Sequence, residues 1–505
     1  MTSKIHSAIP YGFNGRMVEV EGDMNRGLPA FNIVGMADKT INEARERVRS
    51  ALVNSGFSFP DRKVTINLAP ADLAKDGTHL DLPIALSILV LSRQLRPEDT
   101  RDRLFVGELS LDGRVRPVRG IINIVEEARV AKVREVYVPR ANLIQARLVD
   151  GITIYGVETL TELFELLKGQ KEPWEPAEDL KMPGTASTRA TGVFLNHIRG
   201  QELAQRALAI AVAGRHNILI SGPPGSGKTM LAQAAANLLP ELSPEERVEV
   251  TKLHSLAGAT TEQIVMARPF RSPHHTTSAT AIIGGGALAL PGEISLAHKG
   301  ILFLDEVPEF QRVVLESLRQ PLEDREITVS RANRKATYPA DFMLIATMNP
   351  CPCGYLGEPS HECKCSETQI QHYQKKLSGP LLDRIDMYIE VERVKNDELG
   401  KMGGAADGAR HAVVKNTITD AVARQRQRYG RGGVYNSSLS SFQVTEKLSL
   451  APPVRKLLAS ASERLNLSAR AYFKTIKVAR TIADLEGSAE IEVHHLAEAL
   501  TYRKR

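Results

Sequence analysis

The fold of this chain is decided by one stretch of its sequence, HNILISGPPGSGKT at residues 216–229. The apolar residues 216–221 predict a short buried strand, and residues 230–239 are typical of a helix. Between them lies the pattern G-x-x-x-x-G-K-[ST], whose backbone N–H groups can surround nucleotide phosphates at a helix N-terminus. The loop consists of Gly222, Pro223, Pro224, Gly225, Ser226, Gly227, Lys228 and Thr229. We expect Lys228 to bind the phosphates of ATP and Thr229 to bind Mg²⁺.

Two further apolar segments end in polar residues that suit the same site. Residues 300–304 lead into Asp305 and Glu306, and residues 342–348 lead into Asn349. A carboxylate at the C-terminal end of a buried parallel strand lies beside the phosphate loop. We therefore expect Asp305 to hold Mg²⁺ through water, Glu306 to polarise the attacking water, and Asn349 to contact the γ-phosphate. These segments predict an α/β core with a parallel sheet.

Arg384 lies in residues 378–386, after the last helix expected for this core. An arginine at this place can reach the nucleotide of a neighbouring subunit as a trans-acting finger. It can equally pair on the surface with Asp383 or Asp386. The chemistry alone leaves both alternatives open.

Composition places the chain among globular proteins of about three domains, at ~150 residues per domain. It has 505 residues, of which 42% are hydrophobic and 25% charged. No apolar segment reaches the ~18 residues that span a bilayer, and the first residues contain no apolar signal core. We therefore expect a cytoplasmic protein without a membrane partner. The net charge of +6 permits nucleic-acid binding without requiring it.

The sequence divides into three blocks joined by a linker. Residues 1–168 alternate short β-type segments with helical ones and predict an α/β domain. Residues 169–192 are polar and rich in proline, as linkers are. Residues 193–392 contain the ATPase core, and residues 393–505 predict a helical lid, with helices expected over 462–485 and 493–503.

The four cysteines form one cluster, Cys351, Cys353, Cys363 and Cys365, in the pattern C-x-C…C-x-C. Four thiolates at this spacing can hold a structural Zn²⁺ tetrahedrally and stabilise a loop without a core of its own. His361 could replace one thiolate. Reduced free thiols and a redox-labile disulfide are the alternatives.

Two basic segments are candidates for nucleic-acid contact. Arg331, Asn333, Arg334 and Lys335 occupy the tip of a hairpin expected before the Asn349 segment. Composition alone favours a solvated turn there. Arg424, Arg426, Arg428 and Arg431 form the second segment, for which a solvated helix end is an equal alternative. His274 and His275 receive no assignment.

The order of the phosphate loop, Asp305–Glu306, Asn349 and the 381–386 segment resembles an AAA+ ATPase. Residues 268–276 and 284–298, and residues 321–331 leading into the hairpin, are similar to insertions of the magnesium-chelatase-like branch, which includes the MCM helicases. The whole chain resembles the ComM (YifB-like) competence family. That resemblance implies a bacterial ring-forming ATPase associated with branch migration during natural transformation.

The resemblance also implies roles for individual residues. Arg384 becomes the trans finger, and Arg470 becomes the sensor-2 arginine, acting in cis or in trans, with Arg480 as the weaker candidate. Hairpin residues Arg331, Arg334 and Lys335 would grip DNA phosphates in the ring pore. Residues 1–168 resemble the Lon-protease/ribosomal S5 domain-2 fold. His79 and Ile122 stand where that protease has its serine and lysine, so a scaffold or ligand-binding collar is expected instead of a Ser–Lys dyad.

We therefore predict a Mg²⁺-ATP-dependent motor that assembles as a homo-oligomer, expected to be a hexamer. Its expected substrate is single-stranded or branched DNA during homologous recombination. The alternative is a protein-remodelling or metal-insertion ATPase like magnesium chelatase, with the same nucleotide site and a different substrate in the pore.

Overall fold

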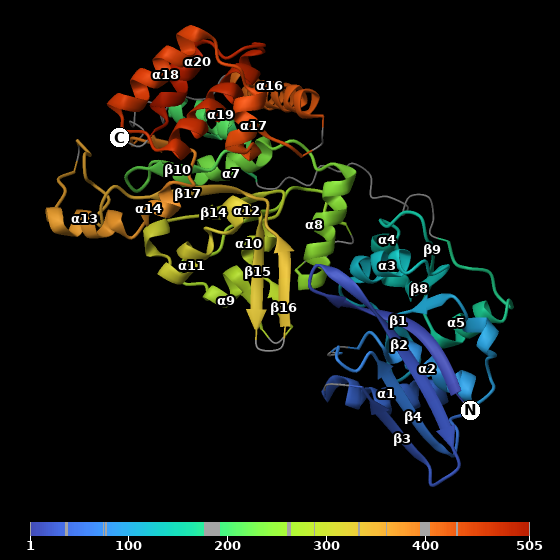
Figure 1. Ribbon diagram of the computed structural model, residues 1–505. Helices are drawn as coiled ribbons and strands as arrows, with labels where there is room; N and C mark the ends of the chain where they lie inside the picture. The colour runs from blue at the N-terminus through green and yellow to red at the C-terminus, as the bar shows by residue number, and fades with distance from the viewer. Residues whose placement is uncertain are drawn as a thin grey trace.

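The computed structural model describes residues 2–35, 39–73, 75, 78–175, 192–259, 264–286, 288–331, 334–359, 361–393, 405–430 and 433–503. An N-terminal α/β part, a second α/β part and a helical C-terminal part follow one another along the chain (Figure 1). Among the described helices, none is both long enough and apolar enough to cross a bilayer. The predicted mixed α/β fold class with a parallel sheet is confirmed. The boundaries of the predicted blocks stay a prediction, and residues 176–191 of the linker lie outside the described residues.

The N-terminal part is built on a seven-stranded sheet of order β3-β4-β2-β1-β5-β8-β9. Strand β2 pairs antiparallel with β1 and β4, and the other neighbours pair in parallel. The strands are β1 (Thr2–Tyr11), β2 (Asn14–Asn25), β3 (Ala30–Val34), β4 (Lys63–Ala69), β5 (Arg103–Phe105), β8 (Glu135–Pro139) and β9 (Thr153–Val157), with a separate pair β6 (Glu108–Leu109) and β7 (Val115–Arg116). The helices are α1 (Lys39–Asn54), α2 (Asp81–Leu91), α3 (Ile121–Val130), α4 (Leu143–Ala146) and α5 (Leu160–Leu167).

Helix α2 is the buried centre of this part, because every residue from Asp81 to Leu91 is buried. Such an apolar helix has no solvent face, so its single carboxylate needs a partner. The partner of Asp81 is Arg47, whose Nε lies 3.0 Å from Asp81 Oδ2. Burial raises the pKa of Asp81 to about 6, although the Arg47 guanidinium opposes the shift.

The second part contains a five-stranded sheet of order β11-β14-β17-β10-β18, in which all neighbours are parallel. Its strands are β10 (Ile218–Ser221), β11 (Phe270–Arg271), β14 (Ile301–Leu304), β17 (Met343–Met348) and β18 (Met387–Glu390). Strands β10, β14 and β17 are buried throughout, as strands covered on both faces must be. Since Ser221 pairs with Met348 and Leu304 with Ala346, the loops that follow these strands leave the same edge.

Helices surround this sheet, and two small hairpins extend from it. The helices are α6 (Glu202–Gly214), α7 (Lys228–Leu238), α8 (Pro244–Ala257), α9 (Ala279–Ile283), α10 (Glu293–Leu296), α11 (Arg312–Ser317), α12 (Pro321–Asp324), α13 (Glu367–Lys375) and α14 (Gly379–Leu382). The hairpins are β12 (Gly284–Gly285) with β13 (Leu290–Pro291), and β15 (Glu326–Arg331) with β16 (Arg334–Pro339). Figure 1 shows β15 and β16 running side by side away from the five-stranded sheet.

The C-terminal part is helical, with α16 (Ala405–Tyr429), α17 (Ser441–Lys447), α18 (Pro452–Arg464), α19 (Ala469–Glu486) and α20 (Val493–Thr501). The residues 462–485 expected to be helical belong to two helices, and the second begins at residues 468–470, where a helix was expected to open. Helix α18 ends at Arg464, Asn466 adopts a φ of 46°, and α19 begins anew at Ala469. The apolar pattern spans the break, but the Ser468 hydroxyl accepts a bond from the Ala471 N–H and caps the second helix.

Helix α8 joins the N-terminal part to the core. The Lys252 ammonium forms an ion pair with Glu126 of α3 and lies 4.2 Å from the centre of the Phe13 ring. The Ser255 hydroxyl donates to Gln145 Oε1 at 3.1 Å. The turn between β1 and β2 therefore lies against helix α8 of the second part (Figure 1).

The C-terminal helices share a hydrophobic core with the second part, and the buried carboxylate of Asp386 adds a polar junction between them. This carboxylate accepts the Asn217 backbone N–H at 2.9 Å, and the Lys474 ammonium of α19 lies 2.9 Å from its other oxygen. His216 lies 3.7 Å away and contacts the Thr481 hydroxyl of α19 at 2.8 Å. Burial would raise the pKa of Asp386, but Lys474 and His216 outweigh it and hold this pKa below its ordinary value.

The substitution Asp386→Asn should destabilise the protein by about 3 kcal/mol, because it leaves the Lys474 charge uncompensated between core and lid. The native carboxylate has a lowered folded-state pKa, so its contribution is complete above about pH 4 and disappears as the pH falls below that value. Chemical denaturation at pH 7 and pH 3 measures both effects. The control Asp383→Asn alters an exposed neighbouring carboxylate and should change stability little. Equal losses of stability in both variants would contradict the role given to Asp386.

Candidate functional site

The loop after β10 surrounds a small space with its backbone. Gly227 caps α7 with a φ of +82°, a conformation that side chains with a Cβ rarely adopt. This turn directs the first N–H groups of α7 into the loop, where the helix N-terminus favours an anion. Helix α7 begins at Lys228, two residues earlier than expected.

Lys228 lies at the centre of this loop. Its ammonium donates to the carbonyl oxygens of Gly222 (2.7 Å) and Pro223 (2.8 Å) and to Asn349 Oδ1 (3.2 Å). Burial lowers the pKa of Lys228, and the carboxylates of Asp305 and Glu306 oppose that shift. The residues expected at the ends of β10, β14 and β17 are thus brought together around one cation.

A hydroxyl–carboxylate network lies on the other side of the loop. The Thr229 hydroxyl donates to Asp305 Oδ2 at 3.1 Å, and the Thr347 hydroxyl donates to Asp305 Oδ1. The Glu306 N–H donates to the Thr347 Oγ1 at 3.0 Å, and Asn349 Nδ2 lies 3.5 Å from Glu306 Oε1. Glu306 itself has a φ of 52°, which turns it sharply away from β14.

Thr347 is the residue of this network that sequence reasoning missed. It is fully buried in β17, two residues before Asn349, and it connects Asp305 with the Glu306 backbone. Its only sequence signal is a hydroxyl within the apolar segment 342–348. Together the site offers a cation, a hydroxyl–carboxylate pair, a second carboxylate and an amide, which suits a phosphate chain, a divalent cation and a water nucleophile.

Arg384 lies beyond α14 and is largely enclosed, with 12% of its side chain exposed. Its Nε donates to the Arg319 carbonyl at 3.0 Å and its Nη1 to the Pro380 carbonyl at 2.7 Å. Its Nη2 donates to the carboxylate of Glu323. The surface partners considered from sequence were Asp383 and Asp386, whereas the structure pairs Arg384 with Glu323 of α12.

Arg470, at the start of α19, converges on the same carboxylate. Its Nη2 donates to Glu323 Oε1 at 3.0 Å, and 53% of its side chain is exposed. Arg480 instead lies inside the helical part, where it donates to Ser488 and Ala489 carbonyls and pairs with Asp484 at 3.1 Å. Of the two sensor-2 candidates, Arg470 is therefore the one at the boundary between lid and core.

A cavity of about 520 Å³ opens between the core and the helical part. Its lining includes Glu323, Arg384 and Arg470, together with Arg325 and Lys477. Burial lowers the pKa of Lys477 to about 8. Cationic side chains outnumber the acidic ones in this lining, which also contains Asp341, Asp383 and Asp386.

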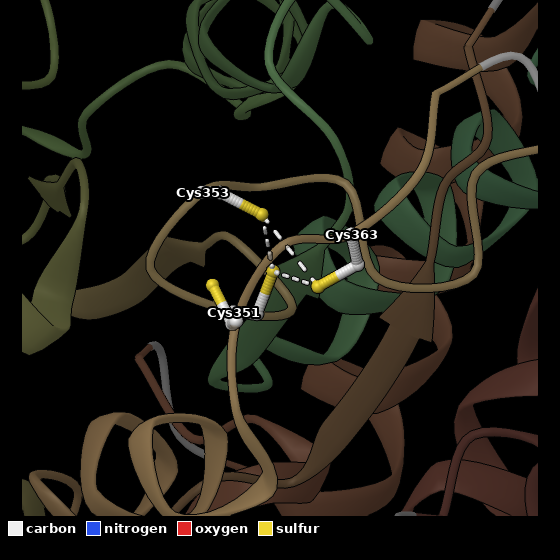
Figure 2. Close-up of side chains that lie close together, drawn as sticks. Cys351, Cys353 and Cys363 are labelled. Carbon is white, nitrogen blue, oxygen red and sulfur yellow. Dashed lines mark hydrogen bonds between the residues drawn. The ribbon is translucent and has the colours of Figure 1, made fainter.

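The cysteine loop follows Asn349 directly. The sulfur of Cys351 lies 3.3 Å from that of Cys353 and 3.6 Å from that of Cys363, and all four sulfur atoms, including Cys365, lie within 4.8 Å of one another. Figure 2 shows the three labelled thiols pointing toward one another. No disulfide joins these four cysteines. A hydrogen bond from the Tyr355 backbone lowers the pKa of Cys353 to about 6.

This loop packs against the phosphate loop. Gly354 has a φ of +85°, and a Cβ at this position would lie 2.7 Å from Pro224 Cδ. Its N–H donates to the Cys351 carbonyl at 3.0 Å and closes a tight turn. His361 stacks on the Tyr355 ring, with 4.8 Å between ring centres.

The basic hairpin is formed as expected by β15 and β16, in which Arg331 pairs with Arg334 and Ser330 with Lys335. Lys335 is exposed. The side chains of Arg331 and Arg334, and Asn333 as a whole, lie outside the described residues. The predicted contact of these residues with DNA phosphates stays a prediction.

In the second basic segment, Arg424 and Arg428 contact another helix of the C-terminal part. Arg428 forms an ion pair with Asp484 of α19, and Arg424 Nη1 donates to the Asp484 carbonyl at 2.7 Å. Burial would lower the pKa of Arg428, but the Asp484 carboxylate outweighs it and raises this pKa. Arg431 lies outside the described residues. These contacts favour a structural role for Arg424 and Arg428.

His79 and Ile122 stand at the positions that resemble the protease serine and lysine. Ile122 is buried in α3, and His79 Nε2 lies 3.2 Å from the Arg119 carbonyl. The predicted scaffold or collar role of this part stays a prediction.

Three family models cover most of the chain, and all three describe magnesium chelatase. Residues 194–399 match "Magnesium chelatase, subunit ChlI", residues 20–142 match "Subunit ChlI of Mg-chelatase", and residues 408–503 match "Magnesium chelatase, subunit ChlI C-terminal".

Similar proteins extend the match to the full length. "Competence protein ComM" of Haemophilus influenzae is 42% identical over 501 residues, covering 99% of this chain and 97% of the relative. YifB of Escherichia coli is 41% identical over 502 residues, with coverage of 99% and 97%. The magnesium-chelatase 67 kDa subunit of Chlorobaculum tepidum is 27% identical over 162 residues, 31% of this chain and 23% of that protein. The chain belongs to the ComM/YifB family, in the magnesium-chelatase-like branch of the AAA+ ATPases.

Proposed function

We propose that this AAA+ ATPase is a hexameric ring motor that moves single-stranded or branched DNA and drives branch migration in recombination during natural transformation. The observation that carries the proposal is the β15–β16 hairpin with exposed Lys335, which leaves the core immediately before the strand that ends at Asn349. The printed name of the Haemophilus relative, a competence protein, supports this process.

Within one subunit, ATP binds to the loop from Gly222 to Thr229. Lys228 neutralises the phosphates, Thr229 and Asp305 hold Mg²⁺, and Glu306 polarises the attacking water while Asn349 orients it. Mg²⁺ supplies neutralisation of the charge on the β- and γ-phosphates. Arg384 and Arg470 of the adjacent subunit contribute positive charge to the transition state.

The DNA contact is electrostatic and independent of sequence. Arg331, Arg334 and Lys335 bind backbone phosphates from the hairpin tip. Because β17 follows β16 in the chain and is itself followed by Asn349, a change at the nucleotide reaches the hairpin through one continuous segment.

The alternative is a protein-remodelling or metal-insertion ATPase, which the magnesium-chelatase family models favour. Both functions use the same nucleotide site. DNA stimulation of ATP hydrolysis separates them, because only the DNA motor requires it.

Glu306→Gln should lower kcat for ATP hydrolysis by about 10²–10⁴-fold, because the amide cannot polarise water. Lys228→Ala should abolish turnover through loss of phosphate binding. Steady-state ATPase assays measure both. The control Glu309→Gln alters a carboxylate three residues further on that pairs with Lys376 at 3.4 Å and should leave kcat nearly unchanged. Full activity of Glu306→Gln would contradict the assigned role.

ATP hydrolysis should rise when single-stranded or branched DNA is added. The double variant Arg334→Ala/Lys335→Ala should lose this stimulation and keep its basal rate. The slope of log affinity against log salt should fall by about 0.7 for each single-strand phosphate that the variant no longer neutralises. The double variant Arg455→Ala/Lys456→Ala removes an exposed arginine and an exposed lysine of α18 and serves as the charge-matched control. Absence of both stimulation and binding at moderate salt would overturn the DNA motor.

We also propose that Cys351, Cys353, Cys363 and Cys365 hold a structural Zn²⁺. A tetrahedral site with Zn–S bonds of ~2.3 Å needs sulfur separations of ~3.8 Å, and three separations here are 3.3–3.6 Å. Because Gly354 of the cysteine loop packs against Pro224, a metal that orders this loop would also support the phosphate loop.

Fully reduced protein purified without chelators should contain one zinc per chain, and Cys363→Ser should lose it. Because the cysteine loop supports Pro224, metal loss should also weaken nucleotide binding. His361→Ala should retain zinc, since four thiolates complete the site. Elemental analysis and titration with a fluorescent ATP analogue provide the two measurements. Absence of metal from the reduced protein would contradict the proposed zinc site. Loss of zinc from His361→Ala would show that His361, in place of one thiolate, is a ligand.

A further inference from the structure

Two arginines from distant parts of the chain share one carboxylate. Arg384 follows α14 in the core, Arg470 opens α19 in the lid, and Glu323 belongs to α12. Arg470 contacts Oε1 of Glu323 and Arg384 contacts Oε2. Two guanidinium groups that converge on one anion form the arrangement that also recognises a phosphate group. Glu323 therefore occupies the place of an anionic ligand between them.

Every nitrogen of the Arg384 guanidinium is engaged within the chain in this arrangement. Its Nε, Nη1 and Nη2 each donate a hydrogen bond within the chain, and 12% of its side chain is exposed. An arginine that stabilises the phosphates of another subunit must direct its guanidinium outward. Its contact with Glu323 must therefore open before Arg384 reaches a neighbouring nucleotide.

Glu323 can be displaced because it is exposed. Its side chain is 49% accessible, and that of Arg470 is 53% accessible. Ion pairs at such positions are weak, since water screens them. A nucleotide phosphate carries more charge than a carboxylate and can compete for both arginines.

The position of Glu323 also connects it with the hairpin. Helix α12 ends at Asp324, Arg325 turns the chain with a φ of 60°, and β15 begins at Glu326. Arg325 lies 3.7 Å from Asp341 at the entry to β17. Movement of α12 would therefore act directly on the base of β15.

We propose that Glu323 is a positioning residue that holds Arg384 and Arg470 together on its carboxylate and yields them to the phosphates of the adjacent subunit's nucleotide. The inference rests on the proposed trans role of these arginines. In the single chain Glu323 restrains both side chains; in the assembled ring the nucleotide replaces it. Glu323 thus competes with ATP for the two arginines.

The test is Glu323→Gln, which keeps the size of the side chain and removes its charge. Weaker restraint should lower the KM for ATP by about two- to fivefold in assays without DNA, with kcat unchanged or raised. A residue that only stabilised the fold would lower the melting temperature without lowering the KM. An unchanged or higher KM would overturn the proposal.

Two companion measurements make the result specific. Glu316→Gln removes a similarly exposed carboxylate that pairs with Arg319 at 2.9 Å, and its KM should equal that of the wild type. Binding of a fluorescent non-hydrolysable ATP analogue to the assembled protein should tighten in Glu323→Gln, and this gain should shrink in an Arg470→Ala background. An equal gain in both backgrounds would contradict action through Arg470.

Failure of this inference is distinguishable from failure of the proposed function. If Lys228→Ala still hydrolyses ATP, the nucleotide site itself is misassigned. If Lys228→Ala is inactive while Glu323→Gln keeps the wild-type KM, only the role of Glu323 fails. Because the assay contains no DNA, its outcome does not depend on the identity of the substrate in the pore.

Discussion

The parallel register of β10, β14 and β17 is the constraint on which the site depends. Ser221 pairs with Met348 and Leu304 with Ala346, so three chain segments leave the sheet at one edge. Each strand is buried throughout, and a one-residue slip would exchange its two faces. The register therefore places Lys228 within 3.2 Å of Asn349, although 121 residues separate them.

Sequence reasoning could predict the parts of the site whose residue types follow directly from their chemistry. Gly222 to Thr229, Asp305 and Asn349 each terminate an apolar segment, so periodicity and residue type sufficed to locate them. Thr347 was beyond this reasoning, because it lies within a strand that is buried throughout and therefore resembles a core residue. Glu323 was also beyond it, because its partners Arg384 and Arg470 lie 61 and 147 positions away.

In the helical part, periodicity alone does not locate the break between two helices. Apolar residues continue at helical spacing across 462–485, yet α18 stops at Arg464 and α19 starts at Ala469. The positive φ of Asn466 and the cap of Ser468 provide the break. This break matters for the site, since it places Arg470 in the first turn of α19 and near Glu323. A continuous helix would hold that arginine in a different direction.

Three of the contacts around the nucleotide site differ in strength. Asp386 binds the lid through buried charges, so this junction resists opening. Gly354 packs directly on Pro224, so the cysteine loop can support the phosphate loop without any charge. Glu323 is half exposed, and its ion pairs are therefore the weakest of the three. The proposed motor needs one contact that nucleotide can open while the others hold, and Glu323 has the exposure and charge for that contact.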